Sequence, residues 1–173
     1  ETAEQEHESP TSLAEAYHTY TVEWTPSSLT WLLDGSEVRR IDGAGVEALT
    51  NPQSIRFNLW ISDSPAWAGE FDVAALPTYQ FVNWVKYYRY EDGEFVLDWT
   101  DDFDTFDTKR WGKGNWTWAE NLADHAPANA LVRDGTLILA LTPEGETGFS
   151  GDVPKDTDDS GSSGSTGAAS SGS

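Results

Sequence analysis

Three side chains suited to sugar recognition alternate along one short segment. Between Ile55 and Ile61, the residues Arg56, Asn58 and Trp60 share one face of an expected strand, and apolar residues occupy the other face. An indole stacks on the C–H face of a sugar ring, while an amide or a guanidinium forms paired hydrogen bonds with its hydroxyl groups. The row predicts a carbohydrate-binding strand. The alternative is a mixed, half-exposed strand face without a ligand.

A second cluster of the same kind follows two glycines. Trp116, Trp118 and Asn121 come after Gly112 and Gly114, so we expect them on a loop. The chain has nine tryptophans, and they cannot all be core, because a buried indole needs a partner for its N–H group. Some of these rings are expected on a binding face, although a loop anchored by packed tryptophans has the same pattern.

The acidic and histidine residues suggest no further site. Five aspartates lie close together in the sequence, at Asp98, Asp101, Asp102, Asp104 and Asp107. They lack the glycine and glutamate positions of an EF-hand loop, so a solvated acidic turn is the simpler interpretation. The spacing of His7, His18 and His125 does not suit a metal site.

Short alternating strands must position the binding residues. We expect strands near residues 20–24, 29–33, 55–61, 80–90, 95–100 and 136–142. Asp34-Gly35 is typical of a two-residue hairpin, so the segments around Trp31 and Val38 should pair antiparallel. Residues 91–94 suit another hairpin, and Asp134-Gly135 is a further turn signal. With no sustained helical period, these patterns predict an all-β fold, a β-sandwich or jelly roll.

The chain divides into one domain with polar ends. Residues 1–16 are polar and rich in glutamate, residues 17–150 carry the expected strands, and residues 151–173 are rich in Asp, Ser and Gly. We expect a polar loop, one β-sandwich and a flexible linker. Because the sequence contains no methionine, we also expect the natural N-terminus to lie upstream of Glu1.

Composition excludes several classes of partner. The 30 acidic residues outnumber the 10 basic ones, and the net charge of -20 repels nucleic acids and anionic membranes. No apolar run reaches the roughly 20 residues of a membrane span. Without cysteine there is no disulfide or thiolate metal site, so extra stabilisation would come from packing or from a hard cation bound by oxygen.

Several separate motifs lie between about residues 17 and 155. They are His18-Thr19-Tyr20-Thr21-Val22-Glu23-Trp24-Thr25-Pro26, Asp34-Gly35, Phe57-Asn58-Leu59-Trp60, Asn83-Trp84-Val85-Lys86, Phe103-Asp104-Thr105-Phe106-Asp107 with Arg110-Trp111, and Asp134-Gly135-Thr136-Leu137. Together they closely resemble glycoside hydrolase family 16 and, more narrowly, the bacterial lichenases, which are 1,3-1,4-β-glucanases. In the usual chain order of this family, the last two of these motifs come first. Their order here resembles the circularly permuted lichenases, in which residues 91–94 would join the usual C-terminus to the usual N-terminus.

The resemblance implies a concanavalin A-like jelly-roll sandwich with a cleft that binds a β-glucan. It also implies cleavage within the polymer, with retention of the configuration at the anomeric carbon. Such enzymes use two carboxylates about 5 to 5.5 Å apart, which the family places on one strand as Glu-x-Asp-x-Glu. That motif is absent from this sequence, and Glu4, Glu6 and Glu8 copy only its spacing. In a permuted member the catalytic strand would precede Glu1. We therefore predict an incomplete sandwich, no catalytic residue in this chain, and no hydrolysis by the chain alone.

The resemblance also implies binding residues. The positions that contact substrate correspond to Arg56, Asn58, Trp60, Trp116 and Asn121. The positions that hold a structural calcium ion correspond to Asn83, Asp102 and the carbonyl of Gly135, with Asp102 replacing the asparagine expected there. No catalytic cofactor is implied.

These expectations combine into a secreted, monomeric β-glucanase, tethered by its linker to a downstream module. The rival hypothesis is a non-catalytic carbohydrate-binding module or lectin of the same fold, since a fold does not determine function. A calcium-dependent structural module is the third. A Glu-x-Asp-x-Glu strand upstream of Glu1 would separate the first hypothesis from the second.

Overall fold

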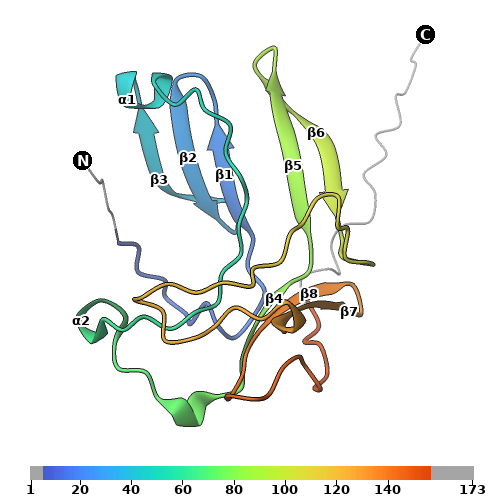
Figure 1. Ribbon diagram of the computed structural model, residues 1–173. Coiled ribbons are helices and arrows are strands. Elements are labelled where there is room, and N and C mark those ends of the chain that lie inside the picture. The colour runs from blue at the N-terminus through green and yellow to red at the C-terminus, as the bar shows by residue number, and fades with distance from the viewer. Residues whose placement is uncertain (1–5, 157–173) are drawn as a thin grey trace.

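The computed structural model describes residues 6–156, which form an all-β fold of antiparallel strands (Figure 1). Three small sheets account for the strands. Their members, in sheet order, are β1 (Tyr20–Trp24), β2 (Ser28–Leu33) and β3 (Ser36–Asp42); β4 (Thr78–Val82), β8 (Thr136–Leu141) and β7 (Ala130–Arg133); and β5 (Val85–Glu91) with β6 (Glu94–Asp101). The predicted all-β class, in the antiparallel arrangement of a jelly roll, is confirmed.

The helices are short and were not predicted. They are α1 (Ala44–Glu47), α2 (Pro65–Ala68) and the 3-10 turns η1 (Val73–Ala75) and η2 (Pro127–Asn129). The predicted loop at 1–16 and linker at 151–173 lie partly outside the described residues, at 1–5 and 157–173. Residues 6–16 contain no strand or helix.

Asp-Gly dipeptides turn three of the hairpins. Asp34-Gly35 joins β2 to β3, Asp92-Gly93 joins β5 to β6, and Asp134-Gly135 joins β7 to β8. Both residues of each pair have positive φ, for example 50° and 77° at Asp34-Gly35. That conformation matches the twist of two-residue hairpins. The hairpins predicted at Asp34-Gly35 and at residues 91–94 are confirmed, and so is the turn predicted at Asp134-Gly135.

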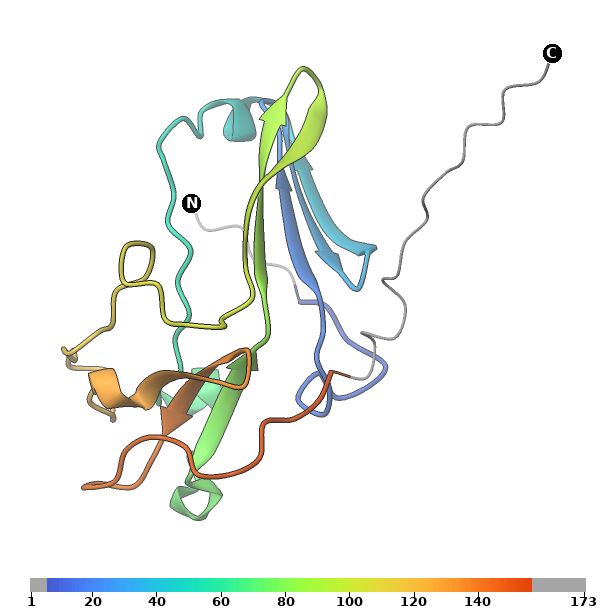
Figure 2. The same cartoon turned by 90° about the vertical axis from the view of Figure 1, so that its right-hand side faces the viewer.

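The expected strand at 55–61 is wrong. The structure assigns this segment no strand, and among residues 6–156 its neighbourhood has only an isolated bridge between Ser62 and Asn121. Alternation of apolar and polar residues favours a strand, but a strand forms only where a neighbour accepts and donates its backbone hydrogen bonds. The expected strand at 80–90 is divided into β4 and β5, which follow one another along one line in Figure 2.

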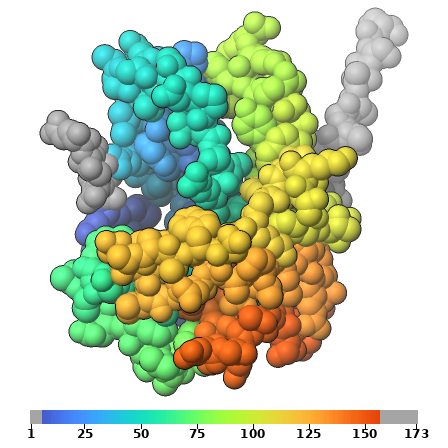
Figure 3. Space-filling view, in the orientation of Figure 1, coloured from blue at the N-terminus to red at the C-terminus, as the bar shows by residue number. Residues whose placement is uncertain are grey.

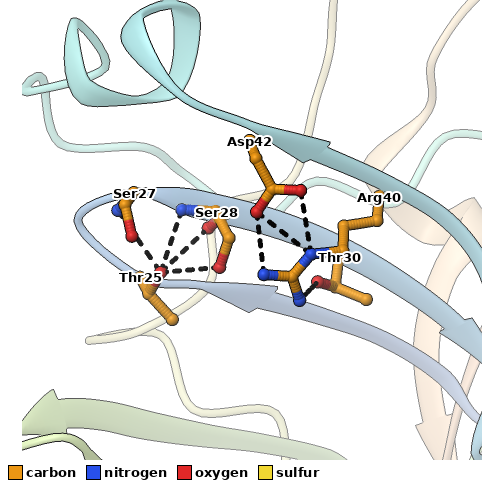
Figure 4. A network of polar contacts seen from close by, with 6 residues as sticks. All are labelled: Thr25, Ser27, Ser28, Thr30, Arg40 and Asp42. Atoms are coloured by element: carbon orange, nitrogen blue, oxygen red, sulfur yellow. Dashed lines mark hydrogen bonds and ion pairs between the residues drawn. The ribbon is translucent and has the colours of Figure 1, made fainter.

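A polar network organises the start of β2 (Figure 4). The hydroxyl oxygen of Thr25 accepts a hydrogen bond from the backbone N–H of Ser28 (3.0 Å), which tightens the turn between β1 and β2. On β3, the guanidinium of Arg40 pairs with Asp42 and donates to the Thr30 hydroxyl of β2 (3.3 Å). The bond from Arg40 to Thr30 links β3 to β2.

The core is centred on β8. Leu137, Ile138, Ala140 and Leu141 of this strand are buried, and Phe103 beyond β6 is completely buried. The outer strands are much more open, since Tyr20 in β1 is 68% exposed. The best-packed part of the described chain therefore lies under β4, β7 and β8.

Candidate functional site

Backbone hydrogen bonds join the two segments that carry the predicted sugar-binding residues. The N–H of Leu122 donates to the carbonyl of Ile61 (3.0 Å), and the N–H of Asp63 donates to the carbonyl of Glu120 (3.1 Å). The isolated bridge lies between these two bonds. Residues 61–63 and 120–122 thus bring the two clusters to one place.

An open cleft of about 1860 Å³ lies beside this junction. Four of the five predicted substrate residues line it, namely Arg56, Asn58, Trp116 and Asn121. Small-molecule sites occupy about 300 to 1,000 Å³, so this cleft has room for a segment of a polymer. In Figure 3 the loop at residues 112–125 belongs to the yellow-to-orange segment that crosses the visible face of the molecule.

Trp60 lies in a neighbouring aromatic cluster and does not line the cleft. Its ring packs against Trp118 with a centroid distance of 4.9 Å and against Trp67 at 6.0 Å. Trp118 in turn lies 5.5 Å from Trp116. Trp60 is thus separated from the rest of its row, and Trp118, which also does not line the cleft, lies between it and the cleft residue Trp116.

Asn121 has an unusual environment for an amide. It is 8% exposed, and its Oδ1 accepts a hydrogen bond from the N–H of Ala123 (3.0 Å). Its Nδ2 has no hydrogen-bond partner among residues 6–156. A buried donor left unpaired costs about 1–3 kcal/mol.

Aromatic residues from β5, β6 and the loop after β6 form another part of the cleft lining, to which the sequence reasoning gave no binding role. Trp99 stacks with Tyr87 at 5.6 Å, and the guanidinium carbon of Arg110 lies 3.8 Å from the Trp99 ring centroid. The indole N–H of Trp111 donates to Asp101 (2.6 Å). The high tryptophan count was the only feature of the sequence that pointed to this part of the cleft lining.

The predicted calcium ligands lie at the ends of three strands. Asn83 follows β4, Asp102 follows β6, and Gly135 lies in the turn before β8. A Cβ atom added to Gly135 would lie 3.7 Å from the carbonyl oxygen of Asp102. The amide N–H of Asn83 donates to Asp156 (2.6 Å), so Oδ1 is the side-chain atom of Asn83 that could hold a cation. Oxygen donors of this kind suit calcium.

The negative charge of Asp156 influences this corner of the fold. The Tyr17 hydroxyl donates to the carbonyl of Pro154 (3.2 Å). Burial raises the pKa of the Tyr17 phenol, a hydrogen bond with Thr136 lowers it, and the charge of Asp156 raises it.

The described residues hold no cluster of three or more His, Cys, Asp or Glu suited to a metal. An ion here would therefore combine the Asp102 carboxylate with amide and carbonyl oxygens.

Two of the three glutamates that imitate catalytic spacing lie in the described part of the chain. Glu6 and Glu8 are exposed in an irregular segment and do not line the cleft. Glu4 lies outside the described residues. No structural feature of Glu6 or Glu8 resembles a pair of carboxylates on one strand.

Known proteins resemble this chain in sequence. A family model described as glycosyl hydrolases family 16 matches residues 1–86. A beta-glucanase of Fibrobacter succinogenes is 50% identical over 161 residues, which cover 90% of this chain. The chain belongs to glycosyl hydrolase family 16. Beta-glucanases of Brevibacillus brevis and Bacillus subtilis are each 35% identical to this family 16 chain over 75 residues, or 43% of its length.

The family 16 chain spans only part of these relatives. It covers 46% of the Fibrobacter protein, 28% of the Brevibacillus protein and 29% of the Bacillus protein.

Within residues 6–156, no helix has the length and apolar character needed to cross a bilayer.

Proposed function

We propose that this chain carries the substrate-binding cleft of a secreted, endo-acting 1,3-1,4-β-glucanase. One observation carries the proposal: four side chains suited to sugar recognition, Arg56, Asn58, Trp116 and Asn121, line one polymer-sized cleft. The shared family and the beta-glucanase relatives support a glucan as the ligand. A polymeric substrate of this kind is met outside the cell, which supports secretion.

Each cleft residue supplies a different part of sugar recognition. Trp116 is 59% exposed, so its ring is available to stack on the C–H face of a glucose unit. Arg56 and Asn58 provide paired donors and, in the amide, an acceptor for hydroxyl groups. Asn121 lines the same cleft. The acidic chain and a neutral glucan have no charge attraction, so binding rests on stacking and hydrogen bonds.

Hydrolysis in this proposal is of the retaining, double-displacement type. One carboxylate attacks the anomeric carbon, while a second protonates the leaving oxygen and later activates water. We propose that both come from a Glu-x-Asp-x-Glu strand outside these 173 residues, because the sequence lacks the motif. The chain alone is then a binding platform without hydrolytic activity.

We propose a circularly permuted chain order to go with this division. The family model matches residues 1–86, whereas the similarity to the Fibrobacter beta-glucanase covers 90% of the chain. The turn at Asp92-Gly93 between β5 and β6 follows shortly after residue 86. We propose that this turn joins the usual ends of the family's chain, and that the protein is a monomer with a linker from residue 151 to a downstream module.

Replacing Trp116 tests the cleft directly. We expect Trp116→Ala to weaken binding of a mixed-linkage β-glucan oligosaccharide at least about tenfold, as is typical when a central aromatic contact is truncated. Calorimetric titration of the natural full-length protein measures the effect. Trp67→Ala is the matched control, because Trp67 is 74% exposed but does not line the cleft. Equal losses in the two variants would contradict the assignment of the cleft.

Calcium should stabilise the fold through Asn83, Asp102 and the Gly135 carbonyl. Such an ion would tie together the ends of β4, β6 and β7. We expect calcium to raise the melting temperature by about 2–4 °C for each kcal/mol of binding, and a chelator to reverse the rise. Asp102→Ala should remove the response, whereas Asp104→Ala, at an exposed neighbouring position, should keep it. A calcium response that survives Asp102→Ala and Asn83→Ala would place the ion elsewhere.

A non-catalytic carbohydrate-binding function is the second candidate. It is favoured by the same absence of a Glu-x-Asp-x-Glu motif in a chain with an open cleft. Both candidates predict glucan binding, and only the enzyme predicts hydrolysis when a catalytic strand is present.

A further inference from the structure

The exposed ring of Trp116 is held by a histidine. The loop at 112–118 has no helix or strand, so the backbone alone does not restrict the indole. The Nδ1 atom of His125 lies 2.9 Å from the carbonyl oxygen of Trp116. The two ring centroids are 5.5 Å apart with an interplanar angle of 38°. His125 therefore contacts both the backbone and the ring of this residue.

The same imidazole packs against a second indole. Its ring stacks on Trp118 with a centroid distance of 5.5 Å and an interplanar angle of 23°. Gly114 comes close to the group as well, since a Cβ added there would lie 3.6 Å from the Cβ of His125 and 3.7 Å from Nε1 of Trp116. His125 lines the cleft with Trp116. The imidazole thus bridges two indoles at the cleft.

The hydrogen bond determines which nitrogen carries the proton. A carbonyl oxygen only accepts, so Nδ1 must be protonated and donate. The neutral tautomer with hydrogen on Nδ1 and the imidazolium both satisfy this requirement. The bond to the Trp116 carbonyl consequently persists whether or not the ring is charged.

We propose that His125 is a positioning residue of the glucan site, which orients the Trp116 ring for stacking before the sugar arrives. This inference rests on the proposed function. A side chain that is already ordered loses less conformational entropy on binding. Without His125, the ring of Trp116 must be immobilised by the glucan itself, and the affinity falls accordingly.

Three variants test this role by titration with a mixed-linkage β-glucan tetrasaccharide, using the natural full-length protein. We expect His125→Leu to weaken affinity about three- to tenfold, the loss typical of immobilising one further side chain. His125→Asn can still donate to the Trp116 carbonyl and should recover most of the loss. His7→Leu is the control, because His7 is exposed in the irregular N-terminal segment and does not line the cleft.

A double-variant cycle separates positioning from a general structural effect. If His125 acts through the Trp116 ring, His125→Leu should cause no further loss in the Trp116→Ala background. Thermal unfolding of each variant checks that the fold remains. Absence of glucan binding by the unmodified protein would overturn the proposed function. Normal unmodified binding with unchanged affinity in His125→Leu, or with losses that add in the double variant, would overturn the role of His125 alone.

Discussion

The 173 residues alone should release no reducing sugar from mixed-linkage β-glucan or laminarin. A chain extended upstream by a strand with Glu-x-Asp-x-Glu should hydrolyse the mixed-linkage glucan. The physical reason is that stacking and hydrogen bonds bind the polymer, while cleavage needs a nucleophile and a proton donor about 5 to 5.5 Å apart. Uncatalysed hydrolysis is many orders of magnitude slower than enzymatic turnover, so the expected difference is between background and measurable activity.

The controls for this assay identify the source of any activity. In the extended chain, replacing both motif glutamates by glutamine should abolish hydrolysis and leave glucan binding intact. If the 173 residues alone were active, Glu6→Gln and Glu8→Gln would show whether the N-terminal glutamates are responsible. If neither chain hydrolyses the glucan but both bind it, the carbohydrate-binding function is favoured over the enzyme.

Phe103→Ala should cause a large loss of stability. Phe103 is completely buried, and its ring lies 6.1 Å from that of Trp111. Truncating a buried phenylalanine costs about 3–5 kcal/mol, because the transfer energy is lost and a cavity remains. That amount is a large part of the stability of an ordinary domain. Urea unfolding should show a strongly lowered midpoint.

Phe95→Ala is the matched control for this stability experiment. Phe95 lies in the same region of the chain, in β6, but is 38% exposed, so its truncation should cost clearly less. The Phe103 variant should also bind glucan more weakly, because Trp111 lines the cleft and loses its packed neighbour. Equal loss of stability in the two variants would show that Phe103 is not part of the core that supports the cleft.

The sequence by itself determined the local features of this protein. The Asp-Gly hairpins, the all-β class and the family 16 motifs depend on residues that are neighbours in the chain. A two-residue turn with positive φ is such a case, since Asp34-Gly35 meets its requirements without any distant contact. The candidate residues Arg56, Asn58, Trp116 and Asn121 could be named for the same reason, because residue type and alternation indicate their chemistry.

Only the tertiary structure decided how these residues are combined. Residues 55–61 alternate as a strand would, but the described chain offers them no pairing partner, and so Trp60 packs on Trp118 and Trp67. The contacts of His125 with the two indoles likewise depend on how one irregular loop folds back on itself. Pairing and loop packing are set by contacts between side chains and backbone that no local pattern records, because the same alternation is compatible with a paired strand and with an unpaired segment.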